Sequence, residues 1–342
     1  MVDSGNLRLR LFGLAISLVA LWVVVRSVDL GAAIDQVARA NPAYLVVCLG
    51  AIAMQVGLRS VRWRLLLPRR DGHPIPLYRI PPVLLVGYLG NAVLPARLGE
   101  PIRAYLIARR ERVGALECFG SVVLERIVDT ATLAVVAFVA AVAVGAPEWI
   151  TRATAFVAIV CTVLIVGIVA IGVAPFVRFG RQVTGRLPFL GRFEPLLTRL
   201  DDFARGLDRP SRSAAIVVAV GVSGVCWMLD ASIFWLVAQS IGVNVSFAAA
   251  LLVAAVTVLG TALPSAPGYV GTFELAASAT AQTLGVAAAP AFALAILAHA
   301  MTVLPSAFAG GVSLVAMDVS LGRLAADATD AENRPMPAEV PS

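Results

Sequence analysis

Long apolar segments, separated by shorter segments that carry arginine, make up most of the chain. About 20 helical residues cross the roughly 30 Å hydrocarbon core of a bilayer. Six segments approach or exceed that length, namely 9–26, 43–64, 118–146, 153–175, 213–241 and 291–316. Two shorter apolar segments, 82–95 and 247–263, end at Leu-Pro and run into glycine-rich turns. The pattern predicts an all-α polytopic membrane protein with about six full transmembrane helices plus two re-entrant helical hairpins.

The composition agrees with a membrane location. Apolar residues make up 59% of the 342 positions and charged residues 14%, against about 45–50% and about 25% in soluble globular domains. All 27 basic residues are arginine. The four cysteines have no paired spacing and there are only two histidines, so we expect no disulfide framework, no metal site and no cofactor.

The distribution of arginine predicts the topology. With a cytoplasmic N-terminus and two re-entrant hairpins, the inner segments hold 23 of the 27 arginines and the outer segments hold three. Inner loops of membrane proteins carry such an excess of basic residues. We therefore expect both termini to be cytoplasmic. Hairpins whose two arms both cross the membrane would give the same sides, so arginine counting leaves the choice between re-entrant and fully spanning hairpins open.

The chain is expected to form a single integral membrane domain over residues 1–317. Its halves would cover about 43–175 and 213–317, joined by a cytoplasmic segment, 176–212. Within that segment the sequence FEPLLTRLDDFARGL places apolar residues at helical spacing, which predicts an interfacial amphipathic helix. The tail, 318–342, is rich in proline and acidic residues and is predicted to be disordered. The N-terminal apolar segment is interpreted as an uncleaved first span.

A short motif occurs once in each half. LPARLG (94–99) recurs as LPSAPG (263–268), and three predicted spans separate the copies. An odd number of spans brings the copies to the membrane from opposite faces, as in an inverted-topology repeat with a substrate site near the midplane. The alternative is that each copy is an ordinary surface loop. The predicted hairpin turns are Pro95, Gly99, Pro264, Pro267 and Gly268.

Ionisable residues also lie inside predicted spans. Glu125, Arg126 and Asp129 occupy VLERIVDT near the start of an apolar span, within one arc of a helix, and Arg126 can pair with Asp129 at i,i+3. Charges at membrane depth are costly and usually face a cavity in pairs. The sequence therefore favours a charge-lined cavity over a cluster that only anchors the helix end.

The second half holds few ionisable residues. Glu274 is the only Asp, Glu, Lys or Arg between residues 231 and 317, and we expect it to pair with an arginine of the first half; the candidates are Arg97, Arg103 and Arg126. Asp230, in mid-span, likewise requires a donor. For His299, also in mid-span, a neutral imidazole hydrogen-bonded to a neighbouring helix is favoured over a proton relay.

Arginines also gather at the end of the second span, in GLRSVRWRLLLP (57–68). Snorkelling side chains and an interfacial tryptophan explain this composition. A second interpretation is that Arg59 and Arg62 contact a lipid phosphate, because the guanidinium fork matches phosphate oxygens.

Taken together, RWRLLL, LPARLGEPIRAYLI, SVVLERIVDT and LPSAPGYVGTFELA resemble the lysylphosphatidylglycerol synthase transmembrane-region family, also called flippase-like domain proteins, over residues 10–317. The resemblance implies a domain that moves a lipid between leaflets. It assigns substrate binding to the family's polar positions, which here are Arg97, Glu100, Arg103, Glu125, Arg126, Asp129 and Glu274. The sequence contains no soluble synthetase domain and no catalytic motif, so lysyl transfer by this chain is not expected.

The leading hypothesis is a non-enzymatic lipid translocase of the bacterial inner (plasma) membrane. Its partner would be an anionic phospholipid or a polyprenyl-phosphate-linked lipid, with a separate lipid-modifying enzyme as a further partner, and nucleic acid is not expected. One alternative is a membrane-embedded transferase with a polyprenyl-phosphate donor, in which Glu100 or Glu125 acts as the carboxylate. Another is a non-transporting scaffold for a lipid-modifying enzyme.

Overall fold

In the computed structural model the chain forms a bundle of helices. The structure describes residues 18–23, 26, 28–69, 72–94, 97–171, 175, 182, 200–207, 214–262, 265–320 and 324. In the range 97–171, side chains are described as far as residue 167. No β-strand occurs within these ranges.

The principal helices follow one another with short connections. They are α2 (Leu30–Ala38), α3 (Pro42–Leu66), α4 (Ile80–Val93), α5 (Gly99–Glu111), α6 (Ala115–Ala143), α7 (Glu148–Ile171), α10 (Ala215–Ser240), α11 (Phe247–Gly260), α12 (Thr272–Thr283) and α13 (Ala288–Ala316), with short 3₁₀ turns η1 (Leu77–Arg79) and η4 (Pro267–Tyr269). Local signals fix several starts. Asn41 accepts a hydrogen bond from the backbone N–H of Ala43 and precedes a proline at the first helical position, a favourable helix start.

Five described helices are long and apolar enough to cross a membrane: α3, α6, α7, α10 and α13. They correspond to five of the six predicted spans; the remaining prediction, 9–26, falls largely outside the described residues. Large apolar side chains on these helices face outward, among them Phe156, Ile159, Val163, Val217, Phe308 and Val315, each at least 64% exposed. Apolar surface on this scale would not persist in water and suits a lipid surrounding.

Two pairs of short helices interrupt the long ones. In the first hairpin α4 packs against α5, and in the second α11 packs against α12. A 14-residue helix is about 21 Å long, shorter than the hydrocarbon core of a bilayer. The first hairpin is tight because Gly99 donates its N–H to Asn91 Oδ1 at 2.9 Å. A Cβ at this glycine would overlap the carbonyl oxygen of Gly87, so only glycine fits.

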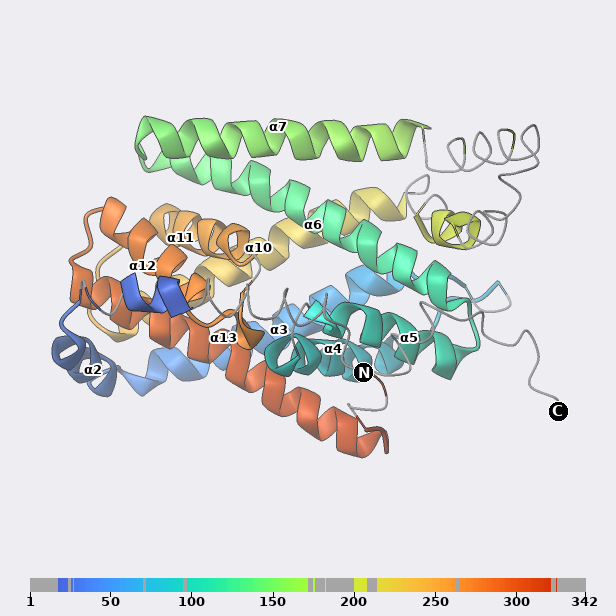
Figure 1. Cartoon of the computed structure of the whole chain (residues 1–342), viewed down its shortest axis with the longest axis horizontal. Helices are drawn as coiled ribbons and strands as arrows, with labels where there is room; N and C mark the ends of the chain where they lie inside the picture. Colours follow the sequence, from blue (N-terminus) through green and yellow to red (C-terminus); the bar gives the residue numbers. More distant parts are fainter. Residues whose placement is uncertain are drawn as a thin grey trace.

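The two halves of the chain are packed into each other. Helix α10 packs against α3, α13 packs against α4, and α6 packs against α11. In Figure 1, α4 and α5 lie toward one end of the molecule and α11 and α12 toward the other. The described parts of the connections within the hairpins meet between them, where η4 packs against α4. We call them the first tip (residues 94, 97 and 98) and the second tip (residues 261, 262 and 265–271).

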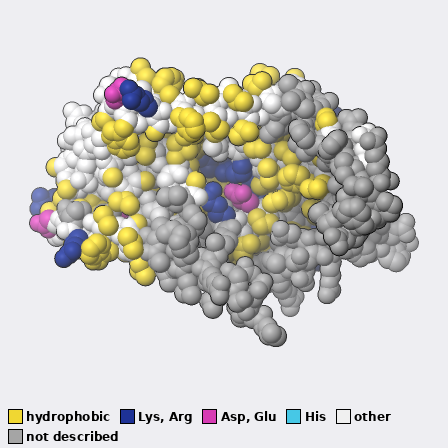
Figure 2. Space-filling model, turned by 45° about the horizontal axis from the view of Figure 1, so that its top comes forward, with side chains coloured by type: hydrophobic (Ala, Val, Ile, Leu, Met, Phe, Trp, Pro, Cys, Tyr) yellow, Lys and Arg dark blue, Asp and Glu magenta, His cyan; other side chains and the backbone are white. Residues whose placement is uncertain are grey.

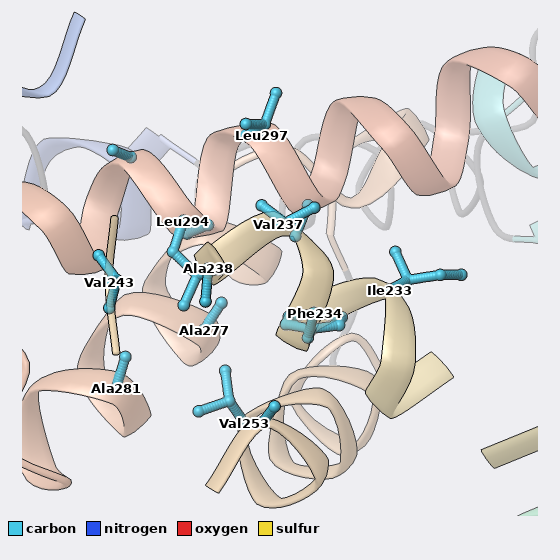
Figure 3. Packing of buried hydrophobic residues seen from close by; sticks show 14 of the residues in the cluster. Ile233, Phe234, Val237, Ala238, Val243, Val253, Ala277, Ala281, Leu294 and Leu297 are labelled. Carbon is cyan, nitrogen blue, oxygen red and sulfur yellow. The ribbon is translucent and has the colours of Figure 1, made fainter. Parts of the chain in front are cut away.

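The largest hydrophobic cluster lies in the second half. It gathers small and branched side chains of α10, α11, α12 and α13 around Phe234 and Phe292, with α3 contributing Cys48. Figure 3 shows Val237 and Leu294 interlocking between α10 and α13, with Ala277 and Val253 below them. Small residues allow helices to pack closely, and in this cluster they hold the second hairpin, α11 and α12, against α10 and α13.

Part of the predicted cytoplasmic helix is seen in the structure. Residues 200–207 are helical, and Phe203 packs on Phe119 of α6 with ring centroids 6.0 Å apart. Gly206 lies directly on the backbone of Glu117. This segment therefore packs on the bundle, while the rest of the predicted amphipathic helix and nearly all of the predicted disordered tail lie outside the described residues.

Candidate functional site

A cavity of about 280 Å³ lies at the centre of the molecule, between the two halves. Helices α3, α4, α5, α6, α10, α11, α12 and α13 and both tips line it. Figure 2 shows basic and acidic side chains at the base of a hollow flanked by hydrophobic side chains. The lining includes three arginines, Arg59, Arg97 and Arg126, and three carboxylates, Glu100, Asp129 and Asp230.

One side of the cavity carries an ion pair between α3 and α10. Arg59 donates to Asp230 Oδ2 at 2.9 Å and to the hydroxyl of Tyr88 at 3.4 Å. The two charged side chains are 18% and 12% exposed. The predicted need of Asp230 for a donor is thus met, and Arg59, one of the predicted phosphate contacts, lines the cavity.

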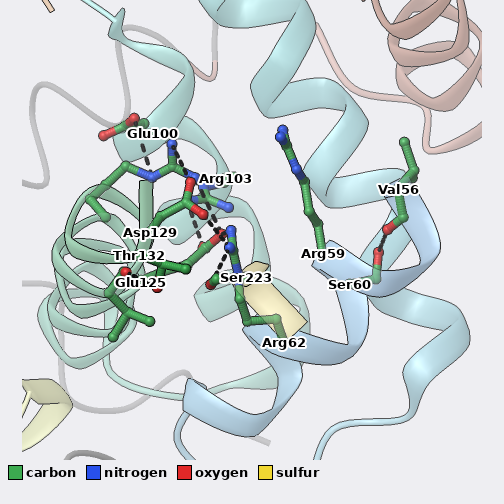
Figure 4. Close-up of polar contacts among 12 residues, drawn as sticks. Val56, Arg59, Ser60, Arg62, Glu100, Arg103, Glu125, Asp129, Thr132 and Ser223 are labelled. Carbon is green, nitrogen blue, oxygen red and sulfur yellow. Dashed lines mark hydrogen bonds and ion pairs between the residues drawn. The ribbon is translucent and has the colours of Figure 1, made fainter. Parts of the chain in front are cut away.

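Behind the cavity wall lies a fully buried charge cluster. Arg62 donates to Glu125 Oε1 at 2.6 Å, to Ser223 Oγ at 2.7 Å and to Asp129 Oδ1. Arg103 lies 2.8 Å from the other oxygen of Glu125. Figure 4 shows Arg62 directed at this cluster, away from Arg59 on the same helix. Arg62 has no exposed side-chain surface, so in this arrangement it binds carboxylates; the second interpretation of the sequence gave it a lipid phosphate.

Arg126 connects the buried cluster to the cavity. Its guanidinium lies 3.3 Å from Glu125, 3.8 Å from Asp129 and 3.9 Å from Glu100. The contact with Asp129 is the i,i+3 pair predicted from the sequence. These separations exceed those around Arg62, and the side chain of Arg126 is 34% exposed. Arg126 is therefore the cation of the cluster that is accessible from the cavity.

Arg97 occupies the first tip and reaches the second. Its φ of 54° places a non-glycine residue in the left-handed region, a conformation that surrounding contacts must hold. The guanidinium donates to the carbonyl oxygen of Thr261 at 2.5 Å and lies 5.3 Å from the ring centroid of Tyr269. No carboxylate of the described residues pairs with it. Arg97 thus joins the two tips and keeps its charge uncompensated.

The charges around the cavity do not cancel. The lining residues and their ion-pair partners comprise five arginines, Arg59, Arg62, Arg97, Arg103 and Arg126, and four carboxylates, Glu100, Glu125, Asp129 and Asp230. One positive charge is left over. The Nε atoms of Arg59 and Arg126 are buried and have no hydrogen-bond acceptor within the described part of the chain. Buried donors normally have partners, so these groups suit an anion in the cavity.

Glu274 forms a separate site. It accepts the N–H of Gly271 at 2.7 Å and lies 2.5 Å from His299 Nδ1, while His299 Nε2 lies 2.7 Å from the carbonyl oxygen of Gly268. The prediction that Glu274 pairs with an arginine of the first half is wrong. The sequence did not show that α12 and α13 bring His299 to it. The expected hydrogen bond from His299 to a neighbouring helix is present.

An apolar groove adjoins the cavity. It encloses about 380 Å³ between α7, α11 and α12, with Ala20 at its edge. Trp149, Val157, Val256 and Leu275 are among its lining residues, and Leu259 lines both the groove and the cavity. A charged cavity and a hydrocarbon-like groove therefore share a wall.

The structure divides the predicted site residues into two groups. Arg59, Arg97, Glu100, Arg126, Asp129 and Gly268 line the cavity. Arg62, Arg103, Glu125, Gly99, Pro267 and Glu274 are not part of its lining, the first three because they lie in the buried cluster behind it. Pro95 and Pro264, two predicted turns, lie outside the described residues.

Sequence reasoning missed several lining residues, notably Gln55, Tyr88, Asn91, Trp227 and Tyr269. Asn91 and Tyr269 adjoin the two repeated motifs, and that position is the one signal that points to them. Within the described ranges, no group of three or more His, Cys, Asp or Glu is arranged to hold a metal ion.

A family model and a curated relative each match most of the chain. A model of the family described as the lysylphosphatidylglycerol synthase TM region matches residues 10–310. The chain is 26% identical to Glycosyltransferase AglD of Haloferax volcanii, over 94% of this chain and 56% of that protein. It therefore spans little more than half the length of this relative.

Two further relatives carry no named activity. A UPF0104 membrane protein of Methanothermobacter thermautotrophicus is 24% identical over 76% of this chain and 81% of its own length. A UPF0104 membrane protein of Methanocaldococcus jannaschii is 22% identical with the same coverage. No solved structure gives a significant match.

Proposed function

Because the chain belongs to the lysylphosphatidylglycerol synthase transmembrane-region family, we propose that it moves a lipid with an anionic headgroup from one leaflet of the membrane to the other. The headgroup phosphate would occupy the central cavity. Arg97 and Arg126 would bind it, since both line the cavity and a guanidinium fork matches phosphate oxygens.

The observation that carries this proposal is the uncompensated charge of the cavity. A cavity whose ion pairs cancelled would have no preference for an anion. Here one positive charge is left over, Arg97 has no carboxylate partner in the described part of the chain, and the Nε of Arg126 has no acceptor. One bound phosphodiester would balance the charge and satisfy the donor.

The apolar groove favours a lipid over a water-soluble anion. A soluble phosphate needs no hydrocarbon surface. A lipid whose phosphate sits near Arg126 requires an apolar surface for its chains, and the groove beyond Leu259 supplies one. Burying a chain there would contribute about 0.8 kcal/mol per CH₂ group.

The paired hairpins support movement between leaflets. We infer that both are re-entrant and related by an inverted repeat, because each is too short to cross the bilayer twice and their tips meet at the cavity. Such broken segments in corresponding halves surround the substrate site in many transporters. We further propose that residues 1–317 form a single membrane domain with both termini cytoplasmic in a bacterial inner membrane; the arginine distribution supports this orientation.

Fluorescent lipid transport in vesicles tests the proposal. The full chain is reconstituted with NBD-labelled phosphatidylglycerol, and the fraction of label reduced by external dithionite is followed over time. We expect protein-dependent transport that falls at least tenfold in Arg97→Gln and Arg126→Gln. Arg152→Gln is the matched control, because this arginine is 77% exposed and, among the described residues, pairs with Glu148 alone.

Two outcomes would overturn the assignment. Transport by the Arg97 and Arg126 variants at the wild-type rate would exclude the cavity as the headgroup site. Equal transport of NBD-labelled lipids with cationic, zwitterionic and anionic headgroups would exclude selection by charge.

A second function is favoured by one relative. Glycosyltransferase AglD is named for group transfer, and Glu100 places a carboxylate in the cavity, 22% exposed. A membrane-embedded transferase with a polyprenyl-phosphate donor would use this carboxylate as a base. Incubation of the purified protein with a labelled polyprenyl-phosphate sugar tests this function: product that disappears in Glu100→Gln supports transfer, and absence of product contradicts it.

A further inference from the structure

The number of hydrogens bound by Glu274 and His299 follows from their hydrogen bonds. A backbone carbonyl oxygen only accepts hydrogen bonds, so His299 Nε2, 2.7 Å from the Gly268 oxygen, must carry a hydrogen. At 2.5 Å, His299 Nδ1 and Glu274 Oε1 also need a hydrogen between them. Two hydrogens on these two contacts are one more than a neutral histidine and a carboxylate possess.

Loss of that proton breaks one of the two contacts. A neutral imidazole has one N–H, which either Nδ1 or Nε2 can carry. On Nδ1 it makes a charge-assisted hydrogen bond to the Glu274 carboxylate, which is about twice as strong as a bond to a neutral carbonyl. The remaining lone pair of Nε2 then faces the carbonyl oxygen of Gly268. Deprotonation therefore retains the contact with Glu274 and releases Gly268.

Gly268 belongs to the second tip, which forms part of the cavity. It has a φ of 71° and is followed by Tyr269 at a φ of 62°, so a bond to its carbonyl holds a turn of unusual conformation. A Cβ at Gly268 would lie 3.3 Å from the carbonyl oxygen of Ala92 in the first hairpin. Tyr269 in turn lies under Arg97. Release of Gly268 thus loosens the contact between the tips.

Other ionisable groups near α13 are occupied elsewhere. From α12 only Glu274 faces His299, and from η4 only Tyr269 is ionisable. On α3 and α10, Arg59 and Asp230 pair with each other, and Cys48 of α3 contacts the carbonyl of Ile233. The ionisable side chains that remain on these helices are Tyr88 of α4, which accepts from Arg59, Cys226 of α10, and Asp35 of α2, which is exposed. On α3 they are Tyr44, Arg62, which pairs with Glu125, and Arg64, which donates to the carbonyl of Ile75.

We propose that Glu274 and His299 form a proton-binding site that controls the second tip: with the proton bound the tips are held together, and without it the second tip is free to move. The inference rests on the proposed function only in that the tip belongs to the substrate cavity. Its consequence for that function is that lipid movement depends on the protonation state of this site.

Reactivity of a cysteine in the tip tests this without any transported lipid. Ser265→Cys is introduced into the full chain after its four cysteines are replaced by alanine, and labelling by a water-soluble maleimide is measured from pH 5.5 to 9. Glu274→Gln provides the reference, because its amide donates to Nδ1 while its oxygen accepts from Gly271. It thus reproduces the protonated site at every pH. Dividing each rate by that of the reference removes the intrinsic pH dependence of the thiol.

We expect a rate ratio near one at pH 5.5 that rises at least fivefold by pH 9. His299→Phe, which retains the stacking on Phe273 but has no ring nitrogen, should give the high ratio at both pH values. His73→Gln, a change of the other histidine, should follow the wild type. A ratio that does not change with pH, or a His299→Phe variant as unreactive as the reference, overturns the proposal. Failure of lipid transport alone would leave this result intact.

Discussion

Replacing Arg62 and Arg126 by methionine, one at a time, distinguishes an arginine that stabilises the fold from one proposed to bind substrate. Arg62 and Arg126 both contact Glu125 and Asp129, and removing either changes the net charge of the site equally. They differ in burial, because the side chain of Arg62 is 0% exposed and that of Arg126 is 34% exposed. We expect the first change to act on stability and the second on binding.

The loss of folding free energy in each variant depends on which carboxylates lose a partner. Breaking a buried ion pair by removing one partner costs about 3–5 kcal/mol. After Arg62→Met, Glu125 retains Arg103 at 2.8 Å and Arg126 at 3.3 Å, which places the loss near the lower limit, about 3 kcal/mol. Arg126 makes longer and more exposed contacts, so Arg126→Met should cost roughly 1 kcal/mol.

Thermal unfolding of detergent-solubilised protein, followed by size-exclusion chromatography, measures the difference. For a chain of 342 residues the midpoint shifts by about 1.4 °C per kcal/mol, so Arg62→Met should lower it by roughly 4 °C and Arg126→Met by roughly 1.4 °C. Arg126→Met should nevertheless be the more defective in lipid transport below the midpoint. Equal shifts for the two variants would refute the division between a buried scaffold and an accessible cavity.

Two further substitutions test the packing. Gly99→Ala forces a methyl group onto the carbonyl of Gly87 and should destabilise the protein by about 1–3 kcal/mol. Gly167→Ala, which meets no atom within 4 Å, is a neutral control in the same unfolding assay. Arg152→Ala removes a pair in which both side chains are more than 75% exposed and should change stability by less than about 0.5 kcal/mol; a larger loss in that assay would contradict its surface placement.

Much of the architecture is predictable from the sequence because it depends on local composition. A run of about 20 apolar residues is sufficient evidence for a spanning helix, and five of the predicted spans occur in the structure. The short helices α4 and α11 follow from the Leu-Pro motifs. The short helix α2 was not predicted, because its nine residues carry no span signal; Asp29 starts it by accepting a hydrogen bond from Ala32.

The contacts of the site are less predictable, because they depend on how the helices cross. The pair of Arg126 and Asp129 is local and was found from spacing alone. The pair of Arg59 and Asp230 joins residues 171 positions apart, and only the packing of α10 on α3 selects it. For the same reason Glu274 was assigned to the wrong partner: an arginine of the first half and His299 were equally consistent with the sequence.

The contact between the tips has a consequence for how often the cavity can open. Arg97 supplies a hydrogen bond to a carbonyl and a cation–π contact, worth about 1.5–3 and about 0.5–2 kcal/mol respectively. If these contacts set the difference between joined and separated tips, it is about 2–5 kcal/mol, a population of roughly 3% to 0.02% for the separated state. The population of the separated state, raised or lowered by single contacts of Arg97, would then set the rate of each cycle of the proposed transport.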